Sequence, residues 1–148
     1  MEIEITENNA LEELNRLRRV IGYKTDDPNS EPCFYCGCPA TEKEHTVPIA
    51  YIEELHRLIT IGLIGVEIPE QKIVPTCIEC NRLVRDRYLG SPKQRKNYIK
   101  TKIAQKYKKL LESPQWCDDE ILELEGRLKE HIVIYQELRK LILARLRY

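Results

Sequence analysis

The sequence predicts a mostly helical α+β domain built around two closely spaced pairs of cysteines. Three observations predict this fold class: apolar residues recur at helical spacing over most of the chain, two short segments suit β-strands, and both cysteine pairs have the spacing C-x-x-C. With 148 residues, of which 42% are apolar and 32% charged, the chain suits one compact domain with an appendage. The same composition excludes a disordered or collagen-like chain.

The first predicted helix spans residues 8–21, because Asn8 or Asn9 can cap it and its apolar residues fall on one stripe. The members of this stripe are Leu11, Leu14, Leu17 and Ile21. An apolar stripe needs a partner, so we expect this helix to pack on the body of the protein. A loop over residues 24–32, rich in Asp, Pro, Asn and Ser, follows it.

Two strands and two helices are predicted in the middle of the chain. Gly62 ends the first of these helices and Gly90 ends the second, while the β-branched Ile73 and Val74 favour a strand between them. In chain order, the predicted elements are a strand at residues 42–47, a helix at 49–60, a strand at 72–75 and a helix at 78–89.

Two longer helices are predicted in the C-terminal part of the chain. Ser91 can cap a helix over residues 92–112, and Asp118 or Asp119 can cap a last helix that reaches about Arg147. The apolar stripe of this last helix is wider than a heptad seam, so we expect it to contact more than one neighbour. It could form a homodimer interface, or it could fold back on the first helix.

We expect three regions: an N-terminal helix and linker at residues 1–30, a core at residues 31–91 and a helical region at residues 92–148. The longest mainly apolar run, Ile59–Val66, is far shorter than the roughly 20 residues of a transmembrane helix. The N-terminus is acidic and lacks the apolar stretch of a secretory signal. We therefore expect an intracellular, cytoplasmic protein with no membrane partner.

The formal net charge is zero, with 24 basic and 24 acidic residues, but the charge is unevenly distributed. Residues 1–70 carry a net charge of −8, whereas residues 82–109 contain 11 bases and one acid, a net charge of +10. Basic segments of this kind commonly bind nucleic-acid phosphates, although they also occur as solvated helix faces. Tyr88 and Tyr98 lie among these bases and could stack on nucleobases or pack in the core. The candidate DNA-binding side chains are Arg82, Arg85, Arg87, Lys93, Arg95 and Lys96.

Four of the six cysteines form two matching C-x-x-C pairs. They are Cys33 and Cys36, and Cys77 and Cys80. A chain without a secretory signal does not favour disulfides, whereas two C-x-x-C turns can place four thiolates around one tetrahedral Zn²⁺. We therefore predict a structural zinc on these four residues, with Cys38 as an alternative ligand. Cys117 is far away in the sequence, and we expect it to be a small buried apolar residue.

Three further polar residues flank the cysteine pairs. Glu44 and His45 lie between the pairs, and Asn81 directly follows the last cysteine. A closed zinc site would bring their segments together, so that Glu44 and Asn81 could supply oxygen ligands to a hard divalent cation. The imidazole of His45 could then take a proton from water. Metal-assisted hydrolysis of a phosphodiester needs these groups.

The combined pattern C-x-x-C, E-H-x-x-P and V-P-x-C-x-x-C-N-R resembles the zinc-stabilised branch of the HNH, or His-Me finger, endonucleases. The pattern covers about residues 33–90, and that branch includes phage endonucleases and junction resolvases, so a phage or mobile-element origin would fit. The resemblance implies a zinc-stapled ββα-metal finger, flanked here by an N-terminal helix and two C-terminal helices. It also implies DNA hydrolysis with one catalytic Mg²⁺ or Mn²⁺, His45 as general base, and Glu44 and Asn81 as metal ligands.

Two positions depart from the pattern of that family. Glu44 stands where Asp is more common, so its carboxylate reaches about one methylene further. Lys72 stands where the family has an Asn that braces the loop orienting the histidine, and the neighbouring Gln71 could substitute for it. The alternative function is a catalytically degenerate zinc-finger module that binds DNA or a protein without cutting.

Overall fold

The computed structural model describes Glu12, Asn15 and residues 31–85 and 87–148. Within these residues the fold is mostly helical with one two-stranded antiparallel sheet, which confirms the predicted fold class at that level. The predicted helix at residues 8–21 lies outside the described residues apart from Glu12 and Asn15. In chain order, the elements are β1 (Glu42–His45), α2 (Ile49–Thr60), β2 (Ile73–Thr76), α3 (Ile78–Val84), α4 (Pro92–Lys106), α5 (Lys108–Glu112), α6 (Asp118–Leu122) and α7 (Gly126–Arg147).

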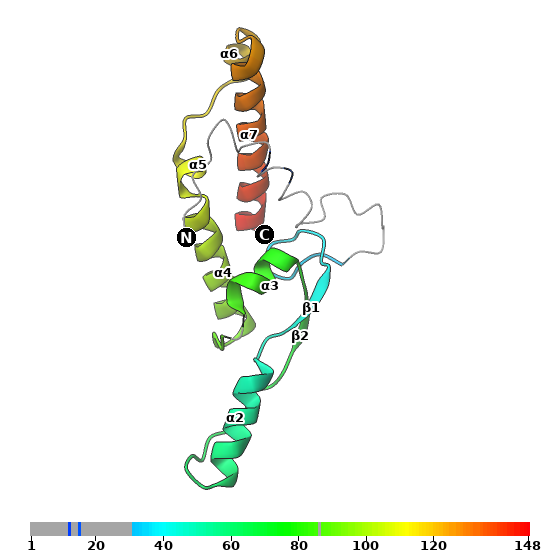
Figure 1. Cartoon of the computed structure of the whole chain (residues 1–148), viewed down its shortest axis with the longest axis vertical. Helices are drawn as coiled ribbons and strands as arrows, with labels where there is room; N and C mark the ends of the chain where they lie inside the picture. Colours follow the sequence, from blue (N-terminus) through cyan, green and yellow to red (C-terminus); the bar gives the residue numbers. More distant parts are fainter. Residues whose placement is uncertain (1–11, 13–14, 16–30, 86) are drawn as a thin grey trace.

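Strands β1 and β2 form a ribbon that joins α2 to the rest of the protein (Figure 1). In the register of the ribbon, Glu44 lies opposite Val74 and His45 lies opposite Ile73. Because successive side chains of a strand point to opposite faces, Glu44 and Val74 are buried while His45 and Ile73 are exposed. The ribbon therefore has an inner face against the core and an outer face that bears His45.

Helices α4 and α7 run antiparallel and side by side, and both contribute to the buried core (Figure 1). Ile99 and Ile103 of α4 and Leu138 and Ile142 of α7 are all fully buried. Full burial of each such side chain stabilises the fold by about 1.5–3 kcal/mol. The predicted cap of α4 is confirmed, because Ser91 Oγ accepts a hydrogen bond from the backbone N–H of Gln94 at 3.3 Å.

Helix α3 is shorter than predicted, since it ends at Val84 rather than at residue 89. Arg85 has φ 45°, a left-handed conformation that stops the helix. The predicted helix at residues 92–112 is likewise interrupted at Tyr107, where φ is −108° and ψ is 21°. This turn accompanies the complete burial of the Tyr107 side chain, whose hydroxyl lies 3.4 Å from Glu79 Oε1.

The last predicted helix is divided into two, so the C-terminal region contains four helical segments rather than two helices. The interruption falls at residues 123–125, and Gly126 follows it with φ 65°. Acidic side chains crowd residues 118–125, and like charges together with a glycine weaken a helix. Cys117 is exposed rather than buried, and its backbone N–H donates to Glu120 Oε2 at the start of α6.

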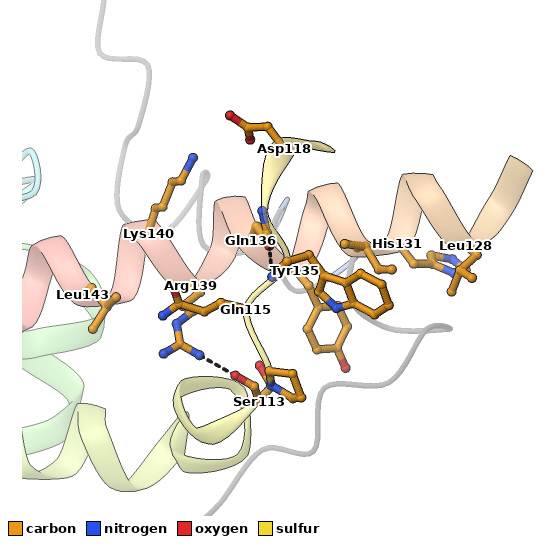
Figure 2. A pocket seen from close by; sticks show the side chains of 13 residues that line it. Ser113, Gln115, Asp118, Leu128, His131, Tyr135, Gln136, Arg139, Lys140 and Leu143 are labelled. Atoms are coloured by element: carbon orange, nitrogen blue, oxygen red, sulfur yellow. Dashed lines mark hydrogen bonds between the residues drawn. The ribbon is translucent and has the colours of Figure 1, made fainter. Parts of the chain in front are cut away.

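The segment between α5 and α6 lies along α7 (Figure 2). Arg139 of α7 donates hydrogen bonds to the backbone carbonyls of Ser113, at 2.8 Å, and Leu110, at 3.3 Å. A cavity of about 460 Å³ lies beside these contacts, and its lining residues come from residues 113–118 and from α7. None of its lining residues belongs to the ribbon or to the two C-x-x-C pairs.

No helix in the described part of the chain combines the length and apolar character needed to cross a lipid bilayer.

Candidate metal centre

The two C-x-x-C pairs come together in one buried cluster. The Sγ atoms of Cys33, Cys36, Cys77 and Cys80 all lie within 4.8 Å of one another, and Cys36 Sγ is 3.7 Å from Cys77 Sγ. Four sulfurs at the usual Zn–S distance of about 2.3 Å would be about 3.8 Å apart, so the spacing suits a tetrahedral ion. The cluster can therefore hold a structural metal such as zinc. Cys38 is buried nearby but is not one of these four.

Local backbone structure positions each pair. In the first turn, the Gly37 N–H donates to the Cys33 carbonyl at 2.9 Å, and Gly37 has φ 74°, which glycine tolerates best. The N–H of Phe34 donates to the carbonyl of Pro75 in β2 at 2.9 Å, and this bond fixes the first turn beside the second. Cys77 is the N-cap of α3 and Cys80 lies in its first turn. The first turn, held against β2, and the start of α3 thus bring the two cysteine pairs to one point.

Hydrogen bonds within the cluster shift the pKa values of the four thiols in opposite directions. The hydrogen bond to Cys36 raises the pKa of Cys33. The hydrogen bonds to Cys77 and Cys80 lower it by more, so that the pKa of Cys33 falls to about 6. Cys36 also has a lowered pKa, chiefly through Cys33, whereas hydrogen bonding to Cys33 raises the pKa values of Cys77 and Cys80. Since a metal binds thiolates, binding must release protons from Cys77 and Cys80, and the affinity for metal falls as the pH falls.

A buried arginine lies against the cluster. Arg145, near the end of α7, is 1% exposed, and its Nη2 lies 3.9 Å from Cys80 Sγ. Its Nη1 forms an ion pair with Glu79 Oε2 at 2.8 Å. Burial by itself lowers the pKa of Arg145, but the charges of Glu79 and the thiolates raise it well above its ordinary value. Zn²⁺ with four thiolates carries a net charge of −2. The positive charge of Arg145 would therefore partly offset the charge of a zinc-loaded site.

Glu79 lies inside the second C-x-x-C turn and connects it to both long helices. Its Oε1 accepts from Lys106 Nζ at 2.9 Å and from the Tyr107 hydroxyl at 3.4 Å, while Oε2 pairs with Arg145. Helices α4 and α7 are thereby attached to the metal-binding turn through charges that are largely removed from water. Partners of this kind orient metal ligands and are costly to remove.

Glu44 is buried on the inner face of β1 and forms an ion pair with Arg95, which is fully buried. Arg95 also donates from Nε to Tyr35 Oη at 3.2 Å and from Nη1 to the carbonyl of Arg87 at 2.7 Å. Burial, followed by the neighbouring Glu44 carboxylate, raises the pKa of Tyr35, so this phenol stays protonated. The other Glu44 oxygen, Oε2, is buried and has no hydrogen-bond partner within the described residues.

The loop that follows His45 is held firmly by the segment before β2. The Gln71 side chain accepts from the Val47 N–H at 2.9 Å and donates to the Val47 carbonyl at 2.6 Å. Thr46 is also bonded to Lys72. Its backbone N–H donates to the Lys72 carbonyl at 2.9 Å, and its hydroxyl donates to the same carbonyl at 3.1 Å. One amide side chain and one backbone carbonyl therefore fix the conformation directly after His45.

The structure brings only some of the predicted catalytic residues to one side of β1. Asn81 of α3 donates from Nδ2 to Glu42 Oε2 at 2.6 Å, and Glu42 shares its strand face with Glu44. His45 is exposed on the opposite face, at the end of the strand. Among the described residues, the cysteine cluster is the one group of three or more His, Cys, Asp or Glu side chains close enough to share an ion.

The predicted DNA-binding residues differ in their exposure. Arg95 is buried with Glu44 and so adds nothing to the exposed basic surface. Lys96 is half-buried, with its Nζ 4.6 Å from the ring centroid of Tyr148 and 5.7 Å from that of Phe34. The exposed members of the set are Arg82, Arg85, Arg87 and Lys93.

The sequence patterns did not point to the roles of Arg95 and Arg145, although a signal for both was present. Arg95 precedes the core residue Ile99 by four positions, and Arg145 follows Ile142 by three, so each arginine continues a buried helical stripe. Comparison with protein-family models, with curated proteins and with solved structures found no match to this chain.

Proposed function

We propose that this chain is a zinc-stapled, metal-dependent endonuclease of the HNH type, which hydrolyses phosphodiester bonds of DNA. The observation that carries the proposal is the pair of hydrogen bonds by which the Gln71 side chain fixes the loop after His45. A general base must stay within hydrogen-bond reach of the water that it deprotonates, and a fixed loop limits the movement of His45 away from such a position. The Gln71 side chain bonds both the N–H and the carbonyl of Val47. It could therefore take over the role of the loop-bracing Asn that the family has at the position of Lys72.

Glu44 and Asn81 are the residues that would hold the catalytic Mg²⁺ or Mn²⁺. Glu44 Oε2 has no hydrogen-bond partner within the described part of the chain, and Asn81 turns its amide nitrogen toward Glu42. Mg²⁺ commonly takes one or two protein oxygens and completes its shell with water and substrate phosphate. When bound, the cation would supply charge stabilisation at the scissile phosphate.

The remaining roles belong to side chains at the surface. The exposed imidazole of His45 would take the proton from the attacking water. Arg82, Arg85 and Lys93 are exposed, and they would bind neighbouring backbone phosphates and hold the DNA in register.

A second candidate function is a DNA-binding module that does not cut. The observation that favours it is the ion pair between Glu44 and Arg95, because a carboxylate that is already neutralised by a buried guanidinium has less need of a cation. Both candidates share the metal-bound scaffold and the exposed basic residues. They differ in whether DNA is hydrolysed.

The nuclease proposal predicts that His45→Ala lowers the rate of DNA cleavage by about 10²–10⁴-fold, because a general base contributes that much. Gln71→Ala should lower the rate by up to about 100-fold through misplacement of the loop. The measurement is cleavage of end-labelled single-stranded and duplex DNA in Mg²⁺ or Mn²⁺. His56→Ala is the matched control, since His56 is an exposed histidine of α2, and it should keep the wild-type rate.

Cleavage that survives His45→Ala at the wild-type rate would contradict the assignment of the base. Tight, salt-dependent DNA binding with no cleavage in either metal would favour the second candidate.

A further inference from the structure

Two exposed tyrosine rings lie beside the loop that follows His45. Tyr51, in the first turn of α2, is 37% exposed, and Tyr88, between α3 and α4, is 39% exposed. The rings are stacked, with centroids 4.6 Å apart and an interplanar angle of 16°. Because the rings stack on each other, each covers one face of its neighbour, and the outer face of Tyr88 is the one that another ring could cover.

The backbone that carries Tyr88 is anchored on both sides of the chain reversal after α3. Arg85 reverses the chain direction with φ 45°, and the carbonyl of Arg87 accepts from the buried Arg95 Nη1 at 2.7 Å. Arg87 also donates from Nη1 to the Tyr98 hydroxyl at 2.7 Å. Since the segment is fixed by these bonds, the Tyr88 ring is held in place before any ligand arrives, which reduces the entropy lost on binding.

Tyr88 also lines a hollow of about 270 Å³ next to the loop that follows His45. Thr46 and Val47, the two residues after His45, form one wall, and Lys72 and Glu70 contribute charged groups of both signs. An aromatic ring, an ammonium group and a carboxylate together match two parts of a nucleotide, its base and its phosphate. The ring can stack on a base, the ammonium can pair with a phosphate, and the carboxylate can accept from an exocyclic amino group.

We propose that this hollow binds one unpaired nucleotide of the DNA substrate, with its base stacked on Tyr88 and its phosphate near Lys72. In a duplex, neighbouring base pairs cover both faces of each base, so a protein ring can reach a base face only where the strand is single or the base is extruded. The inference rests on the proposed nuclease function and adds a substrate class to it. The substrate is DNA with an unpaired nucleotide beside the scissile bond.

The test uses the full-length protein and an oligonucleotide that contains one 2-aminopurine, whose fluorescence falls when the base stacks on an aromatic ring. Binding is measured without added Mg²⁺ or Mn²⁺ and without a chelator, so that the cysteine-bound metal is kept, and cleavage is measured in Mg²⁺ and Mn²⁺. Wild-type protein should quench the fluorescence of the single strand and cut it faster than the matching duplex. Tyr88→Leu should bind the single strand about tenfold more weakly and lose the quenching, whereas Tyr88→Phe should retain both.

Trp116→Leu is the matched control, because Trp116 is also 39% exposed but lies in the distant segment before α6. It should behave as wild type in both assays. Lys72→Ala should reduce the slope of log affinity against log salt by about one, as expected for the loss of one phosphate contact.

The outcomes separate this inference from the nuclease function. Cleavage that is equal for wild type and Tyr88→Leu, with unchanged quenching, would overturn the nucleotide site and leave the nuclease standing. Quenching that depends on Tyr88 without any cleavage would support the site and refute the nuclease. Equal losses in Tyr88→Phe and Tyr88→Leu would also overturn the site, because stacking requires the ring and not the hydroxyl.

Discussion

Replacing Cys80 with Ser is expected to abolish the cooperative unfolding transition of the protein, or to lower its midpoint temperature so far that the variant is largely unfolded at 37 °C. Cys80 is fully buried, and its neighbours in the cluster suit a tetrahedral ion. Binding of Zn²⁺ to four thiolates contributes about 10–16 kcal/mol at pH 7, which is as large as the whole stability of a typical domain, about 5–15 kcal/mol. The measurement is thermal unfolding followed by circular dichroism, before and after treatment with a strong chelator.

The matched control is Cys117→Ser, because Cys117 is the exposed cysteine at the start of α6. This variant should unfold at the wild-type temperature and respond to the chelator as the wild type does. An unchanged transition in Cys80→Ser would show that the cluster does not stabilise the fold through a metal.

Replacing Arg95 with Met is expected to destabilise the protein by about 3–5 kcal/mol, because it leaves the buried Glu44 carboxylate without its counter-charge. The shape of the side chain is roughly kept, so the loss reports the charge and the hydrogen bonds rather than a cavity. The measurement is the midpoint of urea denaturation. The double variant Glu44→Gln/Arg95→Met should recover part of the loss, since neither charge remains buried.

Arg57→Met provides the comparison for this prediction. Arg57 pairs with Glu54 at 2.6 Å, but both side chains are more than half exposed, so water and salt screen the pair. The midpoint of Arg57→Met should match that of the wild type. A midpoint for Arg95→Met equal to the wild-type value would mean that the buried pair is not formed in solution.

The elements around the cysteines could be predicted from the sequence because strong local signals bound them. Helix α2 occupies residues 49–60 as predicted, between Pro48 and Gly62, and Ser91 caps α4 as predicted. The convergence of the two C-x-x-C pairs was also predictable, since their spacing leaves few other uses for four thiols.

The interruptions of the later helices were not predictable in the same way, because they depend on tertiary contacts. Tyr107 breaks the helical run where its buried hydroxyl meets Glu79, 28 residues away in the chain. Arg95 is separated from Glu44 by 51 residues. Helix propensity and local periodicity carry no information on partners so distant, and an arginine is expected at the surface unless such a partner exists.

The residues of the proposed site divide along the same line. His45 and Gln71 were identified from a motif and its departure, and the structure connects them through the loop at Thr46 and Val47. The pairing of Asn81 with Glu42 was not anticipated, since it requires the start of β1 to lie beside α3. A motif identifies residue types, whereas hydrogen-bond partners depend on the packed chain.

The most direct test of the account is the metal content of the intact chain, measured by native mass spectrometry and compared with the mass after denaturation in acid. Four buried cysteines that converge on one point predict one tightly bound zinc per chain, which is lost together with the folded charge-state distribution. A folded chain at the metal-free mass, or at a mass two hydrogens lower for each disulfide formed, would contradict the account.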